Sequence, residues 1–500
     1  MTSEILINLS REETRVAIVE NSVLAEIYLE RRRDRGIVGN IYKGRVVRVL
    51  PGMQAAFVDL GLERAAFLYV SEVLPQSRAH LVEEGEEAEG IKPLPAAEGQ
   101  PGIEDLLRDG QDLLVQATKE PLGTKGAQIT THITLPGRYL VYMPDFNHIG
   151  VSRRIENEKK RMQLRKLVEQ MRPEGAGGFI VRTVSEDHTE TDLKSDMDFL
   201  IKVYREIQER GGRTSAPNIV HRELSLDLKV IRDLFTETVR RVVVDSEEQH
   251  REILSFMERF MGGRAQAVEL YAGETPLFEA RGIELEINRA LERRVWLKSG
   301  GYIVIDQTEA LTAVDVNTGR YVGRRSFEDT ILKTNLEAVK EIVYQLRLRN
   351  IGGLIIIDFI DMANTQNRER VYSTLETELK KDKTKTTILK MSELGLVEMT
   401  RKRARENLYQ ALCEPCPYCE GKGYLKSRTS VCYEIFRELR RRGGQLHGQA
   451  VNLFVNPEVA DRLFNEEREG VEELERELSA KIEITVNNSF HQEQFEVEAG

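Results

Sequence analysis

Three hydrophobic patterns follow one another between residues 300 and 362, and each predicts a different element. Residues of strand composition occupy 302–306 and 311–316, on either side of a short polar turn, which predicts a β-hairpin. From 326 to 350, apolar residues fall at 332, 336, 339, 343 and 346, which is the spacing of an amphipathic helix. Residues 354–357 are apolar throughout, which predicts a fully buried strand.

Carboxylates and one amide come at the ends of these predicted strands. Asp315 and Asn317 end the second strand of the hairpin, and Asp358 and Asp361 follow the buried strand. If the strands are neighbours in one sheet, the carboxylates lie close together, which is costly unless a cation neutralises them. Oxygen ligands from one or two aspartates suit Mg²⁺, which keeps several waters and accepts phosphate oxygens. Aspartate also ends strands because it starts turns well, so the pattern alone leaves both interpretations open.

Short alternating segments dominate the N-terminal part of the chain and predict β-strands. Residues 1–35 alternate and end in a basic turn, and from 36 onwards glycines stand at the bends between strands. Glycine tolerates the bulges and corners that barrel closure requires, so we expect a small barrel over 36–131. Residues 76–108, rich in Pro, Gly and Glu, predict an acidic insertion in one barrel loop, an addition that loops tolerate at little cost.

Helical patterns dominate residues 185–270, and the C-terminal segment 427–500 has the mixed pattern of a small α/β domain. His188, His221 and His250 are scattered through the helical part without the spacing of metal ligands. We therefore interpret these histidines as ordinary surface or packing residues.

The composition is that of a globular protein of two to four domains, with 500 residues of which 40% are hydrophobic and 31% charged. No secretory signal is visible at the start, and no apolar run approaches the roughly 18 residues of a membrane span. The net charge of −10 argues at first sight against a nucleic-acid partner, but the charge is segregated. Residues 82–104 carry much of the excess acid, and basic runs lie at 31–35, 159–166, 401–405 and 437–442. The net charge therefore excludes neither kind of partner.

Four cysteines, three of them close together, do not make a disulfide framework, so a reducing cytoplasmic location is expected. Cys413, Cys416 and Cys419 have the spacing of zinc ligands. Tetrahedral zinc needs four ligands. Either Cys432 completes a set within one chain, or each of two chains contributes a pair.

These segments closely resemble the ribonuclease E/G family of endoribonucleases, over nearly the whole chain. The motifs are VDVNTG at 314–319, IIIDFIDM at 355–362, the barrel sequence from Gly36 and CEPCPYCEGKGYL at 413–425. The resemblance implies an α+β multidomain fold, in which an S1-type OB barrel is inserted in a degenerate ribonuclease H-like domain. A DNase I-like catalytic α/β domain and a zinc link follow. The implied boundaries are 1–35 and 227–290 for the ribonuclease H-like domain, 36–131 for the barrel, 132–226 for a 5′ sensor, 291–412 for the catalytic domain, 413–426 for the zinc link and 427–500 for a small C-terminal domain.

The resemblance also implies roles for individual residues. Asp315 and Asp358 would hold a catalytic Mg²⁺, Asn317 would orient the scissile phosphate, and Asp361 would support them. Cys416 and Cys419 would hold a structural Zn²⁺ shared between two chains, which leaves Cys413 outside the set.

Two further groups of residues match positions that contact RNA in the family. The barrel residues that would face RNA are Phe57, Phe67 and Lys125. The residues that would form a pocket for a 5′-terminal monophosphate are Gly137, Val141, Arg182 and Thr183. A guanidinium fork and a hydroxyl can both donate to a terminal phosphate, in agreement with this role.

The expected function is that of a Mg²⁺-dependent, single-strand-specific endoribonuclease, acting in rRNA maturation and mRNA decay as a homodimer or homotetramer. The metal would lower the pKa of a bound water, and cleavage would leave 5′-phosphate and 3′-hydroxyl ends, with a preference for 5′-monophosphorylated RNA. Two alternatives stay open. The chain could be a non-catalytic RNA-binding scaffold, or a phosphodiesterase acting on DNA, because base stacking binds any single strand.

Overall fold

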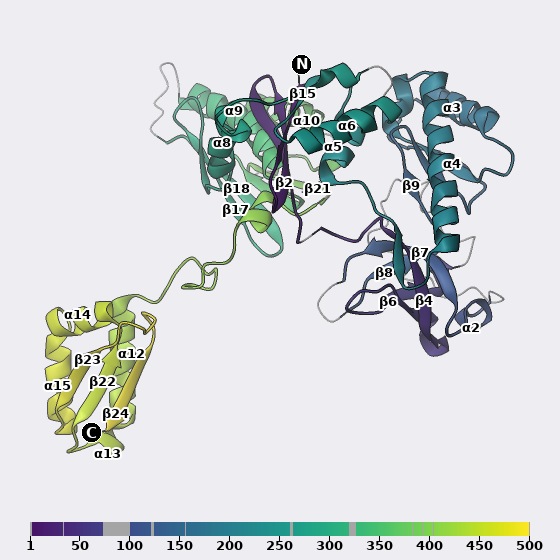
Figure 1. Ribbon diagram of the computed structural model, residues 1–500. Coiled ribbons are helices and arrows are strands. Elements are labelled where there is room, and N and C mark those ends of the chain that lie inside the picture. The colour runs from purple at the N-terminus through teal and green to yellow at the C-terminus, as the bar shows by residue number, and fades with distance from the viewer. Residues whose placement is uncertain are drawn as a thin grey trace. The chain divides into compact units, whose positions relative to one another are not determined.

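The computed structural model describes residues 3–33, 35–73, 101–121, 125–155, 157–260, 264–319, 327–382, 384–392, 394–403 and 405–499. The chain forms two compact units, Met1–Ala411 and Leu412–Gly500, and Figure 1 labels many of their helices and strands. Most of the expected acidic insertion at 76–108 lies outside the described residues. The described part of it contains a short helix, α2 (Ile103–Leu106).

The first sheet joins the start of the chain to segments more than two hundred residues away. Its order is β15-β14-β1-β2-β3, and β1 pairs in parallel with β14. The strands are β1 (Ser3–Leu9), β2 (Glu13–Glu20), β3 (Val23–Arg31), β14 (Val239–Val244) and β15 (Val268–Leu270). Apolar residues of α5 (Leu226–Leu234) and α6 (Glu247–Phe260) pack in its core. The barrel and the four-stranded sheet described below lie in sequence between the two parts of this sheet.

A closed five-stranded barrel follows β3. Its strands run in the order β4-β5-β6-β8-β7, and pairing between β4 and β7 closes it. The strands are β4 (Ile41–Leu50), β5 (Ala55–Asp59), β6 (Ala66–Tyr69), β7 (Asp112–Lys119) and β8 (Gln128–Thr130), and β13 (Asn218–His221) adds to the edge of β4. Small and β-branched residues alternate into its interior, as in Ala56, Val58 and Ala66. The prediction of a small barrel is therefore confirmed.

A four-stranded sheet comes next, in the order β11-β12-β10-β9. Its strands are β9 (Leu135–Pro136), β10 (Leu140–Met143), β11 (Ile149–Val151) and β12 (Gly178–Val181). Two helices, α3 (Glu158–Met171) and α4 (Glu190–Arg213), pack against it. Thr189 begins α4 with a capping box, in which its side chain and that of Asp192 accept each other's backbone N–H groups.

The hairpin predicted over 302–316 lies at the centre of a six-stranded sheet of order β16-β17-β18-β19-β21-β20. The strands are β16 (Arg294–Trp296), β17 (Tyr302–Gln307), β18 (Leu311–Asn317), β19 (Gly353–Asp358), β20 (Thr386–Ile388) and β21 (Leu396–Arg401). The helices of this region are α7 (Leu277–Ala280), α8 (Ile283–Ala290), α9 (Phe327–Leu348), α10 (Thr365–Leu379) and α11 (Leu408–Leu412). Residue 326, the expected start of the helix, lies outside the described residues.

The prediction that residues 354–357 form a fully buried strand is wrong. Ile355 and Ile357 are completely buried, but Leu354, on the opposite face of β19, is 41% exposed. The reason is that α9 and α10 pack their apolar residues only against the face that includes Val314, Ile355 and Ile357. Side chains alternate between the two faces of a strand, so every second residue of β18 and β19 belongs to the other, more exposed face.

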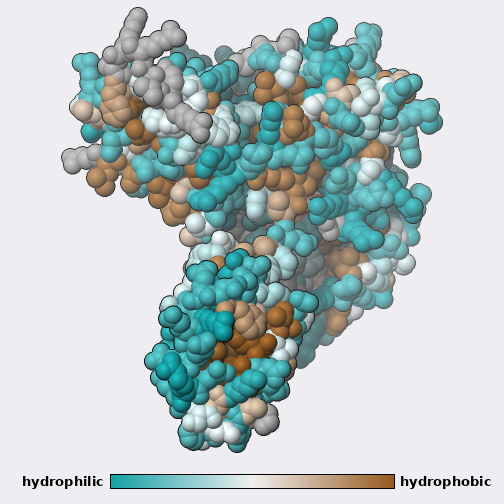
Figure 2. Space-filling view, turned by 90° about the vertical axis from the view of Figure 1, so that its left-hand side faces the viewer, coloured by the Kyte–Doolittle hydropathy of each residue, from teal (hydrophilic) through white to brown (hydrophobic). Residues whose placement is uncertain are grey.

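The C-terminal unit is a three-stranded sheet of order β23-β22-β24 with helices around it. Its elements are α12 (Arg428–Arg441), α13 (Gly443–Leu446), β22 (Val451–Val455), α14 (Pro457–Asn465), α15 (Arg468–Leu478), β23 (Ile482–Val486) and β24 (Phe495–Ala499). Figure 2 shows apolar side chains gathered on one face of this unit. No helix in the described parts of either unit combines the length and apolarity that a membrane span needs.

Candidate active site

Asp315 and Asp358 lie directly opposite each other on neighbouring strands. They are register partners in the parallel pairing of β18 with β19, and both side chains are exposed on the face that α9 and α10 leave uncovered. Asn317 lies two residues along β18 on the same face, and its Nδ2 donates to Asp315 Oδ2 at 2.7 Å. The prediction that these polar groups come together at the ends of adjacent strands is therefore confirmed.

The loop after β19 is held by Asn335 of α9, a residue that the sequence analysis did not single out. Asn335 is completely buried, its Nδ2 donates to the carbonyl oxygen of Ile360 at 2.8 Å, and its Oδ1 accepts from the Ile360 N–H at 3.1 Å. Gly395 also lies close to this loop, since an added Cβ there would be 3.2 Å from Asp361 Oδ1. The two Asn335 hydrogen bonds hold the backbone between Asp358 and Asp361.

The carboxylates repel one another. Burial, followed by the charges of Asp315 and Asp361, raises the pKa of Asp358 above its ordinary value. A divalent cation between Asp315 and Asp358 would relieve this repulsion, and Mg²⁺ commonly uses only one or two protein carboxylates with water and substrate oxygens as its other ligands. Among the described residues, no group of three or more His, Cys, Asp or Glu side chains is arranged to hold a metal. The arrangement therefore fits a two-carboxylate site of the Mg²⁺ type and not a closed cage.

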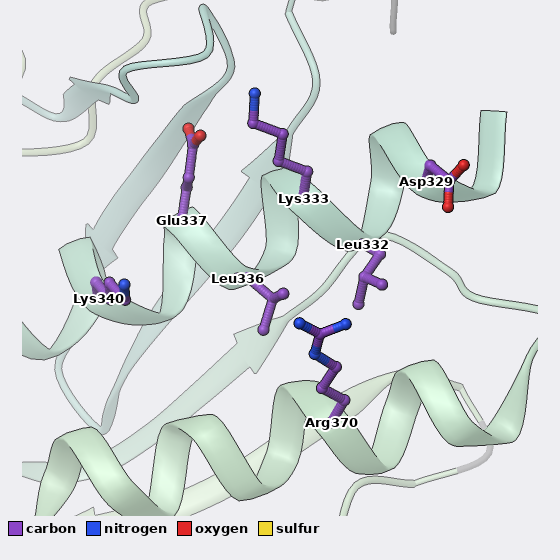
Figure 3. A pocket seen from close by; sticks show the side chains of 7 residues that line it. All are labelled: Asp329, Leu332, Lys333, Leu336, Glu337, Lys340 and Arg370. Atoms are coloured by element: carbon purple, nitrogen blue, oxygen red, sulfur yellow. The ribbon is translucent and has the colours of Figure 1, made fainter. Parts of the chain in front are cut away.

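A cavity of about 320 Å³ lies between α9 and α10, on the helical side of the sheet (Figure 3). Lys333 and Lys340 of α9 and Arg370 of α10 line it together with Leu332 and Leu336. The Arg370 guanidinium points towards the two leucines in Figure 3. None of the predicted site residues lines this cavity, because Asp315, Asn317 and Asp358 project from the opposite face of the sheet.

Phe57 and Phe67 lie side by side on the outside of the barrel. They are register partners on β5 and β6, and their ring centroids are 5.4 Å apart. Tyr69 extends this row, with its ring centroid 4.6 Å from that of Phe67, and the exposed Arg48 is the register partner of Phe57 on β4. Lys125 is exposed in the segment that passes β6, where the Phe67 N–H donates to the carbonyl oxygen of Ala127.

A comparison with neighbouring side chains shows that the two phenylalanines are not core residues. Their neighbours Ala56, Val58, Ala66 and Leu68 are completely buried, whereas both Phe rings are only partly covered. Partly exposed aromatic rings with cations nearby can stack bases and hold phosphates of a single strand. The sequence analysis missed Tyr69 and Arg48, although the spacing of two between Phe67 and Tyr69 and the basic character of Arg48 were available as signals.

Arg182 and Gly137 are in direct contact within the four-stranded sheet. Arg182 Nη1 donates to the carbonyl oxygen of Gly137 at 2.5 Å and pairs with Asp233 at 2.8 Å. Val141 is the register partner of Ile180, which lies two residues before Arg182 and therefore on the same face. Thr183 follows at the start of a 3₁₀ turn, and its Oγ1 lies 2.9 Å from Ser152 Oγ. The four predicted pocket residues are thus close neighbours, with Ser152 and Asp233 beside them.

Asp196 of α4 organises the loop that contains Gly137. Its carboxylate accepts the backbone N–H groups of Arg138, Tyr139 and Leu140 at 3.2, 2.8 and 2.9 Å. Burial raises the pKa of Asp196, although these three hydrogen bonds oppose the rise. A Cβ at Gly137 would lie 2.6 and 2.7 Å from the two carboxylate oxygens, so only glycine fits at this position. The sequence offered no local signal for this contact, because 59 residues separate the two positions.

The cysteines divide into two kinds. Backbone N–H groups of Cys419 and Tyr418, and the Cys419 side chain, lower the pKa of Cys416, and the Gly423 N–H donates to Cys419 Sγ at 3.4 Å. The turn therefore brings the two side chains together and favours the thiolate of Cys416, the form in which cysteine binds zinc. Cys432 is instead completely buried in the core of the C-terminal unit, where burial raises its pKa to about 11. Cys432 is therefore a core residue, which argues against the zinc set within one chain.

Comparison with known proteins relates this arrangement to a family. The model of the Ribonuclease E/G family matches residues 134–404, and that of the RNase E/G thioredoxin-like domain matches residues 415–500. Ribonuclease G of Salmonella typhimurium is 47% identical over 497 residues, and the alignment covers 99% of each chain. Ribonuclease G of Haemophilus influenzae is 45% identical over 496 residues, again with 99% of each chain covered. Ribonuclease E of Escherichia coli K12 is 35% identical over 500 residues, which are 98% of this chain and 45% of the relative.

Proposed function

The chain belongs to the ribonuclease E/G family, a family of endoribonucleases, and on that premise we propose that it is a Mg²⁺-dependent endoribonuclease specific for single-stranded RNA. The observation that carries this proposal is the register pair Asp315 and Asp358 on the open face of the sheet, with Asn317 bonded to Asp315. We also propose that the enzyme acts in RNA processing, namely in rRNA maturation and mRNA decay.

Asp315 and Asp358 would hold the cation through their carboxylate oxygens. A bound Mg²⁺ supplies a water of lowered pKa and neutralises charge that develops on the phosphate. Asn317 keeps the Asp315 carboxylate in place through its Nδ2, and its amide would also orient the scissile phosphate. The Asn335 contacts hold the Asp358 loop in register with β18. The expected products carry 5′-phosphate and 3′-hydroxyl ends.

The barrel and the four-stranded sheet supply binding. Phe57 and Phe67 would stack bases, and Lys125 would hold a phosphate. Gly137, Val141, Arg182 and Thr183 would form the pocket for a 5′-terminal monophosphate. Arg182 already pairs with Asp233, so a terminal phosphate would compete with that carboxylate for the guanidinium.

We further propose that Cys416 and Cys419 share one structural Zn²⁺ with the same pair of a second chain, which makes the enzyme a homodimer or homotetramer. The adjacent side chains of Cys416 and Cys419 and the lowered pKa of Cys416 support a two-ligand contribution, and the burial of Cys432 removes the fourth ligand from a set within one chain. Zinc analysis tests this directly. One ion per two chains is expected, and one ion per chain would contradict the shared site.

The decisive experiment uses a single-stranded RNA with a 5′-monophosphate, incubated with Mg²⁺ and the wild-type protein or its Asp315→Asn variant. We expect internal cuts that leave 5′-phosphates, at least a hundredfold slower in the variant because one metal ligand is lost. The matched control is Glu369→Gln, which changes the charge equally at an exposed position of α10 on the covered side of the sheet. This control should cut at the wild-type rate.

The remaining outcomes separate the alternatives. Equal cutting by the wild-type protein and Asp315→Asn would show that other residues hold the catalytic metal. Tight RNA binding without any cutting would favour the scaffold interpretation. Cutting of an all-deoxy strand at the rate of the RNA would favour a phosphodiesterase that acts on DNA.

A further inference from the structure

The open face of the six-stranded sheet carries an aromatic pair next to the carboxylates. Trp296 on β16 and Tyr302 on β17 are register partners, and their ring centroids are 5.4 Å apart in an edge-to-face arrangement. Trp296 is 61% exposed, which is unusual because the large apolar ring of tryptophan is mostly buried in folded proteins. It is also the only tryptophan in the chain.

Strand pairing places this aromatic pair on the same face of the sheet as the candidate active site. Tyr302 is the register partner of Asn317, so Trp296, Tyr302 and Asn317 form one row across three strands. Asp315 lies in the neighbouring row, with Val304 and Arg294. Strands lie about 4.8 Å apart, so Arg294 and Asp315, two strands apart, are separated by roughly 10 Å at the backbone.

Arg294 adds a cation to the aromatic pair. Its Cζ lies 4.6 Å from the centroid of the Tyr302 ring and 5.8 Å from that of Trp296. An exposed indole with a guanidinium beside it provides a stacking surface for a base and a donor for the phosphate attached to it. A hydrophobic docking peptide would not need the cation, whereas a nucleotide uses both groups.

We propose that Trp296, Tyr302 and Arg294 form a base-stacking subsite for the single-stranded RNA substrate, which seats a nucleotide close to the scissile phosphate. This subsite lies outside the barrel and the 5′-phosphate pocket, and it rests on the proposed function because it extends the same active site. A base stacked on Trp296 would leave its neighbouring phosphate within reach of Asn317 and the Asp315–Asp358 pair. The subsite is a binding element and holds no reacting atom.

Fluorescence of the single tryptophan tests the proposal without cleavage. The wild-type protein is titrated, in buffer without Mg²⁺, with a short single-stranded RNA that also carries a label for anisotropy. We expect quenching of the Trp296 emission that saturates together with the anisotropy. The same backbone without bases should not quench at concentrations that bind. Equal quenching by the abasic strand, or RNA binding with unchanged emission, would overturn the subsite.

Kinetics supply the second readout. Trp296→Ala should raise KM by about tenfold with kcat nearly unchanged, since stacking contributes equally to substrate and transition state. Trp296→Phe should recover most of the loss, because the ring still stacks. Tyr409→Ala is the matched control, since Tyr409 is 53% exposed on α11 and should leave KM unchanged. An unchanged KM in Trp296→Ala would refute the proposal.

Failure of the subsite and failure of the proposed function give different results. If the protein does not cut RNA, the quenching experiment still reports on stacking, because it contains no Mg²⁺ and does not depend on cleavage. If the protein cuts RNA but bound RNA does not quench the Trp296 emission, the proposed function is supported and the subsite is refuted. A blue shift of the emission with rising protein concentration, in the absence of any RNA response, would show that a second copy of the chain covers Trp296 and would overturn the proposal.

Discussion

Replacing Gly137 by alanine should disturb the 5′-phosphate pocket while sparing the carboxylate site. The added Cβ would lie 2.6 and 2.7 Å from the Asp196 carboxylate oxygens and 2.8 Å from Leu200 Cδ1. Real Cβ contacts at such distances are essentially absent, so a neighbour has to move. Asp196 is only 7% exposed and holds three backbone N–H groups, which leaves it no free position to adopt.

The magnitude follows from these contacts. Overpacking in a filled interior costs about 1–3 kcal/mol. Weakening one of the charged hydrogen bonds of Asp196 adds about 1 kcal/mol. We therefore expect Gly137→Ala to lower the free energy of unfolding by about 3 kcal/mol, measured by urea denaturation. Because the Gly137 carbonyl oxygen accepts from Arg182, the shift also moves the guanidinium that would bind the terminal phosphate.

The functional assay compares cleavage of the same RNA with a 5′-monophosphate and with a 5′-hydroxyl. Gly137→Ala should lower the ratio of the two rates and leave the rate on 5′-hydroxyl RNA nearly unchanged. Gly150→Ala is the matched control, because a Cβ there would meet Ile180 Cγ1 at an ordinary 3.4 Å in the same sheet. An unchanged rate ratio in a Gly137→Ala protein of reduced stability would refute the reasoning about the pocket. An unchanged stability would refute the reasoning about Asp196.

Four further predictions concern the catalytic sheet and the barrel. Asn335→Ala should lower the free energy of unfolding by about 2 kcal/mol and slow cleavage, because it removes both hydrogen bonds to Ile360. Thr334→Ala, at an equally buried position whose hydroxyl donates only within its own helix, should keep the cleavage rate. The pKa of Asp358 is raised, so its contribution to the stability of the metal-free protein is complete at low pH and is lost as pH rises through that pKa. Adding Mg²⁺ should therefore stabilise the protein more at neutral than at acid pH. An equal effect of Mg²⁺ at both would contradict the repulsion between the carboxylates. Asp361→Asn removes one source of that repulsion and should move the loss of Mg²⁺ binding to lower pH, as followed by calorimetry. Phe57→Ala should weaken binding of single-stranded RNA by about tenfold in an anisotropy titration, and unchanged affinity would show that the barrel face does not stack bases.

Elements with a strong period could be predicted from the sequence. The hairpin over 302–316, the amphipathic helix that follows and the glycine-rich barrel all have local patterns, and the structure has each of them within a few residues. The strand at 354–357 was mispredicted because four apolar residues in a row do not reveal which faces of a sheet will be covered. Coverage is decided by where α9 and α10 pack, and they pack on one side only.

The candidate site shows the same division. Asp315, Asn317 and Asp358 stand in motifs that the sequence displays directly. Residue type and position at strand ends allowed a metal site there, but only the family resemblance implied their catalytic roles. Asn335, Asp196 and Trp296 contact partners that are distant in the sequence or on other strands. Patterns within a short stretch of sequence therefore could not reveal them.

The sequence by itself determined the elements, the acidic pairs at strand ends and the cysteine spacing, because these depend on residues within one turn or one strand. Only the tertiary structure decided the parallel register that sets Asp315 opposite Asp358, the pairing of β1 with β14 across the inserted barrel, and the burial of Cys432. Register and burial are set by packing between segments far apart in the chain. Such packing is a property of the whole core, and no short window of sequence contains it.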